Sequence, residues 1–142
     1  MKNEKGFSLI EVVVALALLG MIGVAFLGAL STASKAIFIA DEQATAESVA
    51  RSQMEFVKKQ DYIPAPDDGE ATYQKITGIP VGYTIWSVNR AGDTVEDIIG
   101  VPWDSDNNQP VATDAGLQRI KLIIKHHDKP EVIALEGYKV NR

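Results

Sequence analysis

The sequence contains no cysteine, which excludes disulfide bonds, thiol catalysis and metal sites built on cysteine. Its only two histidines, His126 and His127, are adjacent, so an imidazole-based catalytic or zinc site would depend on that single pair. The net charge is −5, and no basic stripe of the kind that nucleic-acid binding needs is present. No spacing of serine, aspartate or glutamate marks a nucleophile with an orienting partner, so the sequence predicts neither nucleic-acid binding nor an enzyme.

The sequence does contain one long apolar run near its amino terminus. Within residues 7–30 only Ser8 and Glu11 are polar. As a helix rising about 1.5 Å per residue, the run is about 36 Å long, enough to cross a hydrocarbon core of about 30 Å. Lys2 and Lys5 precede it, which by the positive-inside rule predicts a cytoplasmic amino terminus and an extracytoplasmic carboxyl-terminal part. We therefore expect a single-pass protein of the cytoplasmic (inner) membrane.

Glu11 is the unusual residue of this run, because a charged side chain in the membrane costs roughly 2.5 to 3.5 kcal/mol even on insertion scales. A cleaved secretory signal would place its cleavage site near Ser31 or Ala33, but the run is too long for that class and Glu11 interrupts its start. An uncleaved signal anchor would account for the length but not for Glu11. A third interpretation comes from the residues around Glu11.

The segment GFSLIE, residues 6–11, resembles the class III signal of the type IV pilin and type II secretion pseudopilin superfamily. The resemblance implies that a prepilin peptidase cleaves between Gly6 and Phe7, and that Phe7 becomes an N-methylphenylalanine. It also implies that Glu11 meets the new amino terminus of a neighbouring subunit during filament assembly. Opposite charges attract far more strongly in a low-dielectric medium than in water. The alternative is that Glu11 extends its side chain to the cytoplasmic interface.

Many members of this family have a proline where this chain has Gly28, and the chain also has Gly20 and Gly23. Glycine weakens a helix interior by roughly 1 kcal/mol relative to alanine, so these glycines could allow the helix to melt locally. The alternative is that they allow neighbouring helices to approach closely.

The helical pattern continues beyond the apolar run, because no proline or glycine interrupts it before Pro64. We expect one helix from about residue 7 to about residue 62. Its predicted packing stripe consists of Ala36, Ile39, Gln43, Ala46, Ala50, Met54 and Val57, at helical spacing. The second half of this stripe is expected to pack on a sheet of the same chain, and the first half on a neighbouring subunit. The segment AESVARSQME, residues 46–55, resembles the corresponding helix of minor pilins and pseudopilins.

After the proline-rich loop at residues 64–69, the pattern changes to short strands separated by turns. The expected strands span residues 70–77, 81–90, 94–101, 117–126 and 131–140, the last two forming a hairpin around a turn that contains His126 and His127. The sequence thus predicts an α+β, pilin-like fold in which a long amino-terminal helix packs on a carboxyl-terminal antiparallel sheet.

The most polar irregular stretch is residues 101–116, where Asp104, Asp106 and Asn108 alternate as calcium ligands can. The glycine and the closing glutamate of an EF-hand loop are missing, which favours an ordinary solvated loop with Asx turns. The calcium site is therefore the weaker expectation, no other cofactor is expected, and the histidine pair is expected to be neither catalytic nor metal-binding.

Taken with the resemblance, these features predict a structural subunit of a type IV pilus or of a type II secretion pseudopilus. Its implied partners are the prepilin peptidase, other pilin or pseudopilin subunits and the inner-membrane assembly platform. The resemblance of residues 46–55 and the absence of a carboxyl-terminal cysteine pair favour a minor pilin or minor pseudopilin. The competing class is a monomeric, membrane-tethered extracytoplasmic binding domain, which would need neither cleavage nor Glu11. The expected parts are a leader (1–6), a transmembrane half-helix (7–30), a soluble half-helix (31–63) and a β-sheet head domain (64–142).

Overall fold

A computed structural model describes residues 8–127 and 129–142. The single α-helix of this part of the chain, α1, spans Leu9–Lys59, so the predicted long helix is confirmed. The chain forms two compact units, whose boundary lies within α1, between Asp41 and Glu42. We call the described residues before this boundary the amino-terminal unit, and Glu42–Arg142 the carboxyl-terminal unit. The four-part division into leader, membrane segment, soluble half-helix and head stays a prediction.

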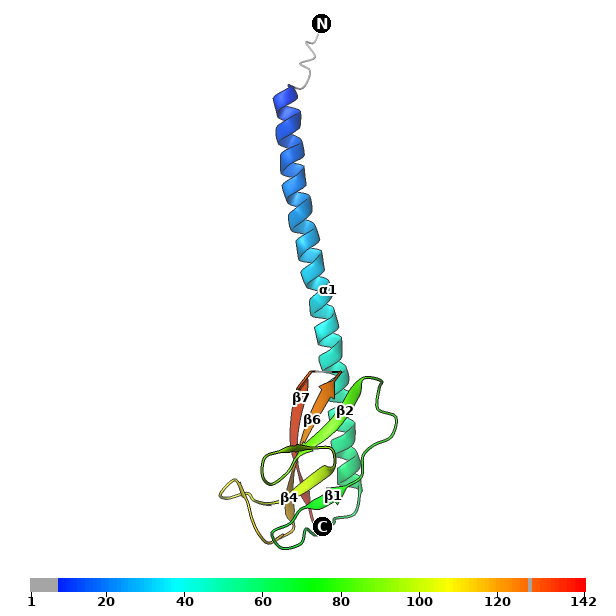
Figure 1. Ribbon diagram of the computed structural model, residues 1–142, viewed down its shortest axis with the longest axis vertical. Coiled ribbons are helices and arrows are strands. Elements are labelled where there is room, and N and C mark those ends of the chain that lie inside the picture. The colour runs from blue at the N-terminus through cyan, green and yellow to red at the C-terminus, as the bar shows by residue number, and fades with distance from the viewer. Residues whose placement is uncertain (1–7, 128) are drawn as a thin grey trace. The chain divides into compact units, whose positions relative to one another are not determined.

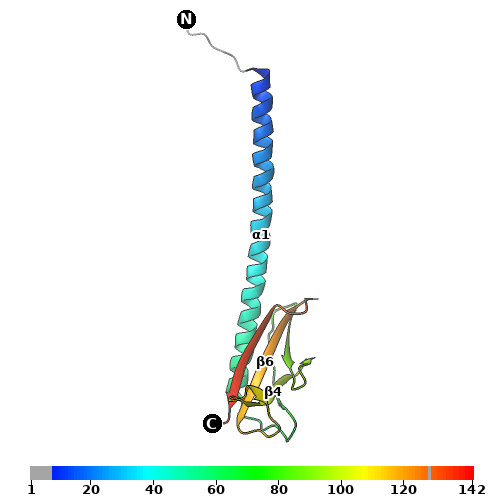
Figure 2. The same cartoon turned by 90° about the vertical axis from the view of Figure 1, so that its left-hand side faces the viewer.

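The carboxyl-terminal unit consists of the last turns of α1 and an antiparallel sheet that lies against them (Figures 1 and 2). The predicted α+β arrangement is therefore confirmed. The strands are β1 (Ala71–Tyr73), β2 (Tyr83–Val88), β3 (Thr94–Val95), β4 (Ile98–Asp104), β5 (Gln109–Pro110), β6 (Leu117–His126) and β7 (Ile133–Val140).

Strand β6 is the centre of the sheet. Along one edge it pairs with β7 over residues Leu117 to Ile124. Its other edge is shared, because β4 pairs with its beginning, at Gln118 and Arg119, and β2 with its end, from Leu122 to His126. The predicted strand 117–126 and its hairpin partner are confirmed, although β7 begins two residues later than expected.

The core lies between α1 and the inner face of the sheet. The helix contributes Ala46, Ala50, Met54 and Val57, which confirms the second half of the predicted stripe. Alternate residues of β6 face them, and Ile120, Leu122 and Ile124 are each fully buried. Burying a side chain of this size stabilises a fold by roughly 1.5 to 3 kcal/mol. The stripe also includes Val49 and Gln53, which the sequence pattern did not identify.

The predicted strand 94–101 is wrong, because two separate strands, β3 and β4, occupy this region. The Ser87 hydroxyl of β2 fills the gap between them. It donates a hydrogen bond to the carbonyl of Asp97 at 2.6 Å and accepts one from the amide of Ile99 at 3.0 Å. The Ser87 side chain thus replaces a backbone hydrogen bond between strands, and the chain bends between β3 and β4.

The predicted strand 70–77 is also too long, since β1 contains only Ala71–Tyr73. Two glutamines of the α1 region bond the backbone that would have continued it. Gln53 Nε2 donates to the carbonyl of Gln74 at 3.0 Å, and Gln53 Oε1 accepts from the amide of Ile76 at 2.8 Å. Gln60 Oε1 accepts from the amide of Gln74 at 2.9 Å. These side chains take the place of a partner strand.

The stretch 101–116, predicted to be irregular, is partly regular. Strand β4 continues to Asp104, and β5 turns back to pair with it through Trp103 and Asp104. The Asp104 carboxylate accepts hydrogen bonds from the amides of Asp106 and Asn107 in the turn between them, which is the predicted Asx turn. Only the part after β5 is an irregular loop.

Candidate functional site

The first part of the amino-terminal unit, residues 9–30, is a helix in which Glu11 is the only polar side chain. It begins after Ser8, whose carbonyl accepts hydrogen bonds from the amides of Glu11 at 3.0 Å and Val12 at 3.2 Å. The most apolar 18-residue window of α1 has a mean hydropathy of 2.6, and none of it is buried within the chain. By length and composition, α1 is the one helix of the described residues that could cross a membrane.

Large apolar side chains of this unit are exposed around the whole circumference of the helix. They include Leu9, Ile10, Val13, Leu16, Leu19, Ile22, Phe26, Leu27 and Leu30, each more than half exposed. A helix that is hydrophobic all round is stable only in a membrane or inside an assembly. Contiguous exposed apolar surface of this extent marks an interaction with lipid or protein.

The three glycines of this helix contact no other part of the chain. A Cβ atom added at Gly20, Gly23 or Gly28 would meet no other atom within 4 Å. The hydroxyls of Thr32 and Ser34 bond back to the carbonyls four residues earlier, at 3.1 and 3.0 Å. Such bonds keep hydroxyl groups satisfied where water is scarce. The glycines therefore leave open helix surface where a neighbouring helix could approach.

Glu11 lies in the first turn of α1 and is exposed. Among the residues that the structure describes, no ion pair involves it. The helix N-terminus favours a nearby negative charge, because the first amides of a helix point outward. Gly6 and Phe7, the predicted cleavage and methylation residues, lie outside the described residues. The roles predicted for Gly6, Phe7 and Glu11 stay predictions.

In the carboxyl-terminal unit, the Asp114 carboxylate accepts four hydrogen bonds. It accepts hydrogen bonds from the Tyr62 hydroxyl, from the amides of Ala65 and Gly116, both at 2.9 Å, and from Gln118 Nε2 at 2.6 Å. Burial alone would raise the pKa of Asp114, but these bonds together hold it below its usual value. Burial and the neighbouring carboxylate raise the pKa of Tyr62. The cluster ties the segment after α1 to the loop before β6, which is a structural role.

Lys139 of β7 is a buried lysine, 5% exposed, that caps the end of α1. Its Nζ donates to the carbonyls of Val57 at 2.9 Å, Lys58 at 3.1 Å and Gln60. The last carbonyls of a helix lack partners within the helix and carry partial negative charge. Burial lowers the pKa of Lys139, an effect that the charge of Asp61 opposes. Sequence reasoning placed Lys139 on a strand without identifying this contact.

The predicted calcium ligands do not converge on a common point with other acidic groups. Asp104 Oδ1 accepts from the amide of Asp106 at 2.8 Å, and its Oδ2 accepts from Asn107 Nδ2 at 2.6 Å. Bonds from Asn107 and from the amide of Asp106 lower the pKa of Asp104. Asn108 takes the left-handed conformation, with φ of 52°. Within the described ranges no group of three or more His, Asp or Glu side chains could hold a metal. Calcium at this turn stays a prediction.

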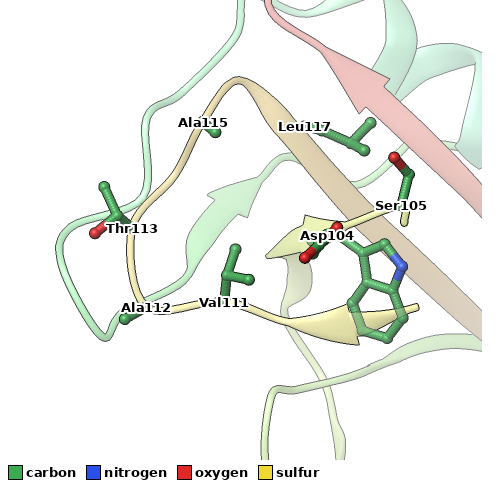
Figure 3. Close-up of a pocket in the computed structure, with 8 residues that line it drawn as sticks. Asp104, Ser105, Val111, Ala112, Thr113, Ala115 and Leu117 are labelled. Atoms are coloured by element: carbon green, nitrogen blue, oxygen red, sulfur yellow. The ribbon is translucent and has the colours of Figure 1, made fainter. Parts of the chain in front are cut away.

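Beside this turn lies an open pocket of about 560 Å³ (Figure 3). It is lined by Trp103, Asp104, Ser105, Val111, Ala112, Thr113, Ala115 and Leu117. Arg119 covers the Trp103 ring, with its guanidinium carbon 3.6 Å from the ring centroid. No residue of this lining is a histidine, lysine or cysteine. The Asp104 carboxylate already accepts hydrogen bonds from Asp106 and Asn107 of the turn. The lining offers no nucleophile paired with a base.

The histidine pair lies at the end of β6 and in the turn that follows. His126 is the last residue of the strand, and His127 has a positive φ of 50°. His126 contacts Glu42 of α1, a contact between residues 84 positions apart that the sequence could not reveal.

A model of the prokaryotic N-terminal methylation motif matches residues 1–27. No curated protein and no solved structure matches the chain. The match supports the class III signal that residues 6–11 predicted. This motif implies a subunit that a prepilin peptidase processes and that assembles with other pilins. Together with the apolar part of α1, it indicates an inner-membrane anchor and a structural subunit rather than an enzyme.

Proposed function

We propose that this chain is a minor structural subunit of a type IV pilus or of a type II secretion pseudopilus. The observation that carries the proposal is the methylation motif of residues 1–27, which includes the start of a helix whose most apolar 18-residue window is fully exposed. The resemblance of residues 46–55 to the helix of minor pilins and pseudopilins supports the minor class. The carboxyl-terminal unit adds a sheet packed on the same helix, which suits a head carried by an assembly helix.

We propose the following course of processing. The prepilin peptidase cleaves between Gly6 and Phe7, and Phe7 is then N-methylated. The α-amino group of Phe7 carries a positive charge, and in a low-dielectric environment the Glu11 carboxylate of a neighbouring subunit is its natural counter-ion. A pair of this kind sets the register between subunits, as buried polar residues do in coiled coils. The assembly platform of the inner membrane would add the subunit to the filament, with its head outside the cytoplasm.

Mass spectrometry of the mature protein tests the processing step. We expect a chain that begins at Phe7 and carries one additional methyl group. A chain that retains Met1, or that begins near Ser31 or Ala33, would contradict the proposal and favour an anchor or a secretory signal.

Substitution of Glu11 tests the assembly step. Glu11→Ala should leave the protein in the membrane and its carboxyl-terminal unit folded, but should strongly reduce incorporation into filaments. A matched control is Glu47→Ala, which removes an exposed helical glutamate paired with Arg51 at 2.6 Å on the carboxyl-terminal unit. The control should assemble normally, because an exposed pair of this kind contributes at most about 0.5 kcal/mol to the stability of the fold.

Normal incorporation of Glu11→Ala would refute the charge pairing while leaving the processing step intact. If the chain is neither cleaved nor incorporated, the monomeric membrane-tethered domain becomes the better explanation.

A further inference from the structure

Strand β7 lies at the edge of the sheet, and its outer side is unpaired. Within the described residues it pairs with β6 alone, from Ile133 to Val140. In Figure 2 this strand faces the viewer, and no other segment of the carboxyl-terminal unit is drawn in front of it. The strands at the two ends of the strand path, β1 and β3, have only three and two residues. Strand β7 therefore provides the longest stretch of open edge among the described strands.

The pairing register shows which backbone groups of β7 point outward. The amide of Asn141 donates to the carbonyl of Gly116 at 2.9 Å, one step beyond the pair of Val140 with Leu117. In an antiparallel pair, residues that exchange hydrogen bonds with the partner strand alternate with residues that do not. The amides and carbonyls of alternate residues therefore point away from β6, at Ala134, Glu136, Tyr138 and Val140. An added strand would give this row of donors and acceptors its partners.

The side chains of β7 do not oppose such an addition. Edge strands are commonly protected by proline, by bulges or by a charged side chain that points inward. Residues 133–140 contain no proline. Lys139 does point inward, but it is already buried, and its ammonium donates to the carbonyls at the end of α1. The charge of Asp61 also supports the charged form of this lysine. Covering the edge would therefore cost Lys139 little further hydration.

The end of this edge is hollowed into a pocket of about 300 Å³. It is lined by Lys58, Tyr138, Lys139, Val140 and Arg142. Three of these residues are consecutive in β7, and successive side chains of a strand point to opposite faces, so the pocket lies on the strand edge itself. Three lining residues are basic and none is acidic. A side chain of an added strand would enter a pocket that favours a negative charge.

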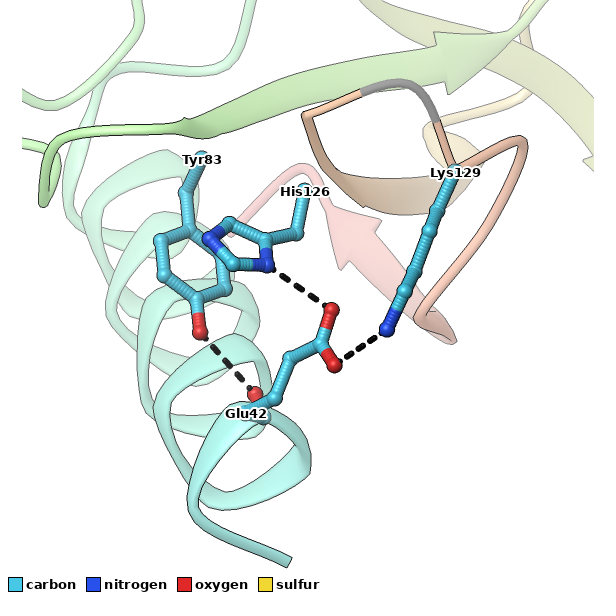
Figure 4. Close-up of polar contacts among 4 residues, drawn as sticks. All are labelled: Glu42, Tyr83, His126 and Lys129. Carbon is cyan, nitrogen blue, oxygen red and sulfur yellow. Dashed lines mark hydrogen bonds and ion pairs between the residues drawn. The ribbon is translucent and has the colours of Figure 1, made fainter. Parts of the chain in front are cut away.

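The exposed cations of this pocket have no carboxylate partner of their own. Elsewhere in the carboxyl-terminal unit, Lys129 donates to the carboxylate of Glu42 (Figure 4). Among the residues that the structure describes, no ion pair involves Lys58 or Arg142. A carboxylate brought by another chain would supply the missing counter-ion.

We propose that the open edge of β7 binds an extended segment of another protein by strand addition. This segment places an acidic side chain in the basic pocket, between Lys58 and Arg142. Backbone pairing holds an extended segment, and the pocket selects an acidic one. The inference goes beyond the proposed function, because a filament subunit and a membrane-tethered domain would both present this edge.

A second copy of this chain fits the edge less well. If two copies paired through β7, the inward-facing residues of one strand would lie opposite those of the other. These residues are Ile133, Leu135, Gly137 and Lys139, and none is acidic. The partner is therefore a different chain with an acidic, extended segment.

Hydrogen exchange of the full chain in detergent micelles, read for single amides by NMR, tests the proposal. The probe is a short peptide of alternating threonine and valine in which glutamate replaces the central valine, with both ends blocked. Saturating peptide should slow exchange of the outward amides of Glu136, Tyr138 and Val140 about tenfold. The amides of Gly137 and Lys139, which face β6, should change far less. This alternation is the signature of an added strand.

A matched peptide with glutamine at its centre tests the pocket. It should produce the same alternation but bind about fivefold more weakly. The double variant Lys58→Gln, Arg142→Gln should bind the two peptides equally. Val140→Pro removes one outward donor and should weaken both peptides about fivefold. Its control, Val140→Thr, keeps the amide and should bind as the wild type does.

The amides of Ile120 to Ile124 report whether each variant keeps its core. The proposal is overturned if the glutamate peptide slows none of the outward amides, or if the wild type binds both peptides equally. Blocked glutamate alone is the third probe, and the strand addition is refuted if it prevents the peptide from binding at all. Slower exchange of the outward amides at rising protein concentration, without peptide, would identify a second copy as the occupant and also overturn the proposal.

Discussion

The contact between Lys139 and the end of α1 leads to a sharp prediction, which concerns Lys139→Met. Methionine keeps most of the volume and the apolar stem of lysine but cannot donate hydrogen bonds. The carbonyls of Lys58 and Gln60 would lose the donor that they have in the folded protein. Val57 would keep one partner, because its carbonyl also accepts from the amide of Gln60 at 3.2 Å.

The size of the effect follows from these contacts. A hydrogen bond from a charged donor contributes about 1.5 to 3 kcal/mol, and two carbonyls lose such a bond. The burial that lowers the pKa of Lys139 offsets part of this gain, because the ammonium gives up its hydration. We therefore expect Lys139→Met to reduce the free energy of unfolding by about 2 to 3 kcal/mol.

Urea unfolding, followed by the fluorescence of Trp86 and Trp103, measures this loss, since both tryptophans lie in the carboxyl-terminal unit. The matched control is Lys58→Met, an exposed lysine at the same helix end, which should change the free energy of unfolding by less than about 0.5 kcal/mol. If Lys139→Met is no more destabilising than this control, the helix cap is not a source of stability.

The pH dependence provides a second check on Lys139. Because its pKa is lower in the folded than in the unfolded state, the unfolded state binds more protons between these two values. Stability should therefore rise with pH as it approaches the ordinary value of 10.5, and Lys139→Met should lose that contribution. A wild-type profile and a Lys139→Met profile of the same slope would refute this assignment.

Two further predictions concern the carboxyl-terminal unit. Asp114→Asn should reduce the free energy of unfolding at neutral pH by about 1.5 to 3 kcal/mol, because the ionised acceptor of four hydrogen bonds is replaced by an amide. Because the pKa of Asp114 is lower in the folded than in the unfolded state, its ionised carboxylate stabilises the fold above the unfolded pKa. This contribution to the free energy of unfolding is lost as the pH falls through the folded pKa. Urea titrations should therefore show the variant and the wild type converging in acid. Gly137→Val should cost about 1 to 3 kcal/mol, because a Cβ at Gly137 would lie 2.8 Å from Sδ of Met54. Met54→Ala should recover part of that cost in a double-mutant cycle, and full additivity would show that the two residues do not meet.

The sequence predicted the elements whose pattern is local. The length of α1 follows from the absence of proline and glycine between Gly28 and Pro64, and β6 follows from the alternation of Ile120, Leu122 and Ile124. Both patterns depend only on neighbouring residues, and both elements are confirmed. The methylation motif is likewise a short continuous segment, which is why residues 6–11 alone were enough to predict the class III signal that the motif model supports.

Contacts between distant residues could not be predicted in this way. Gln53 reads as one more polar residue of a helix, yet it is fully buried and bonds the backbone after β1. Asp114 reads as a loop residue, and its partners Tyr62 and Ala65 lie some 50 positions earlier. In each case a side chain satisfies backbone or hydroxyl groups that only the folded chain brings near, so local propensity carries no signal of it.

The two glutamines of the α1 region also protect the sheet against unwanted growth. A strand with unpaired backbone groups is a template on which another chain can add, and the segment after β1 would otherwise present such an edge. The amide and carbonyl of Gln74 and the amide of Ile76 are already bonded to Gln53 and Gln60. A foreign strand would find these groups occupied, so the helix that holds the core together also discourages aggregation at this end of the sheet.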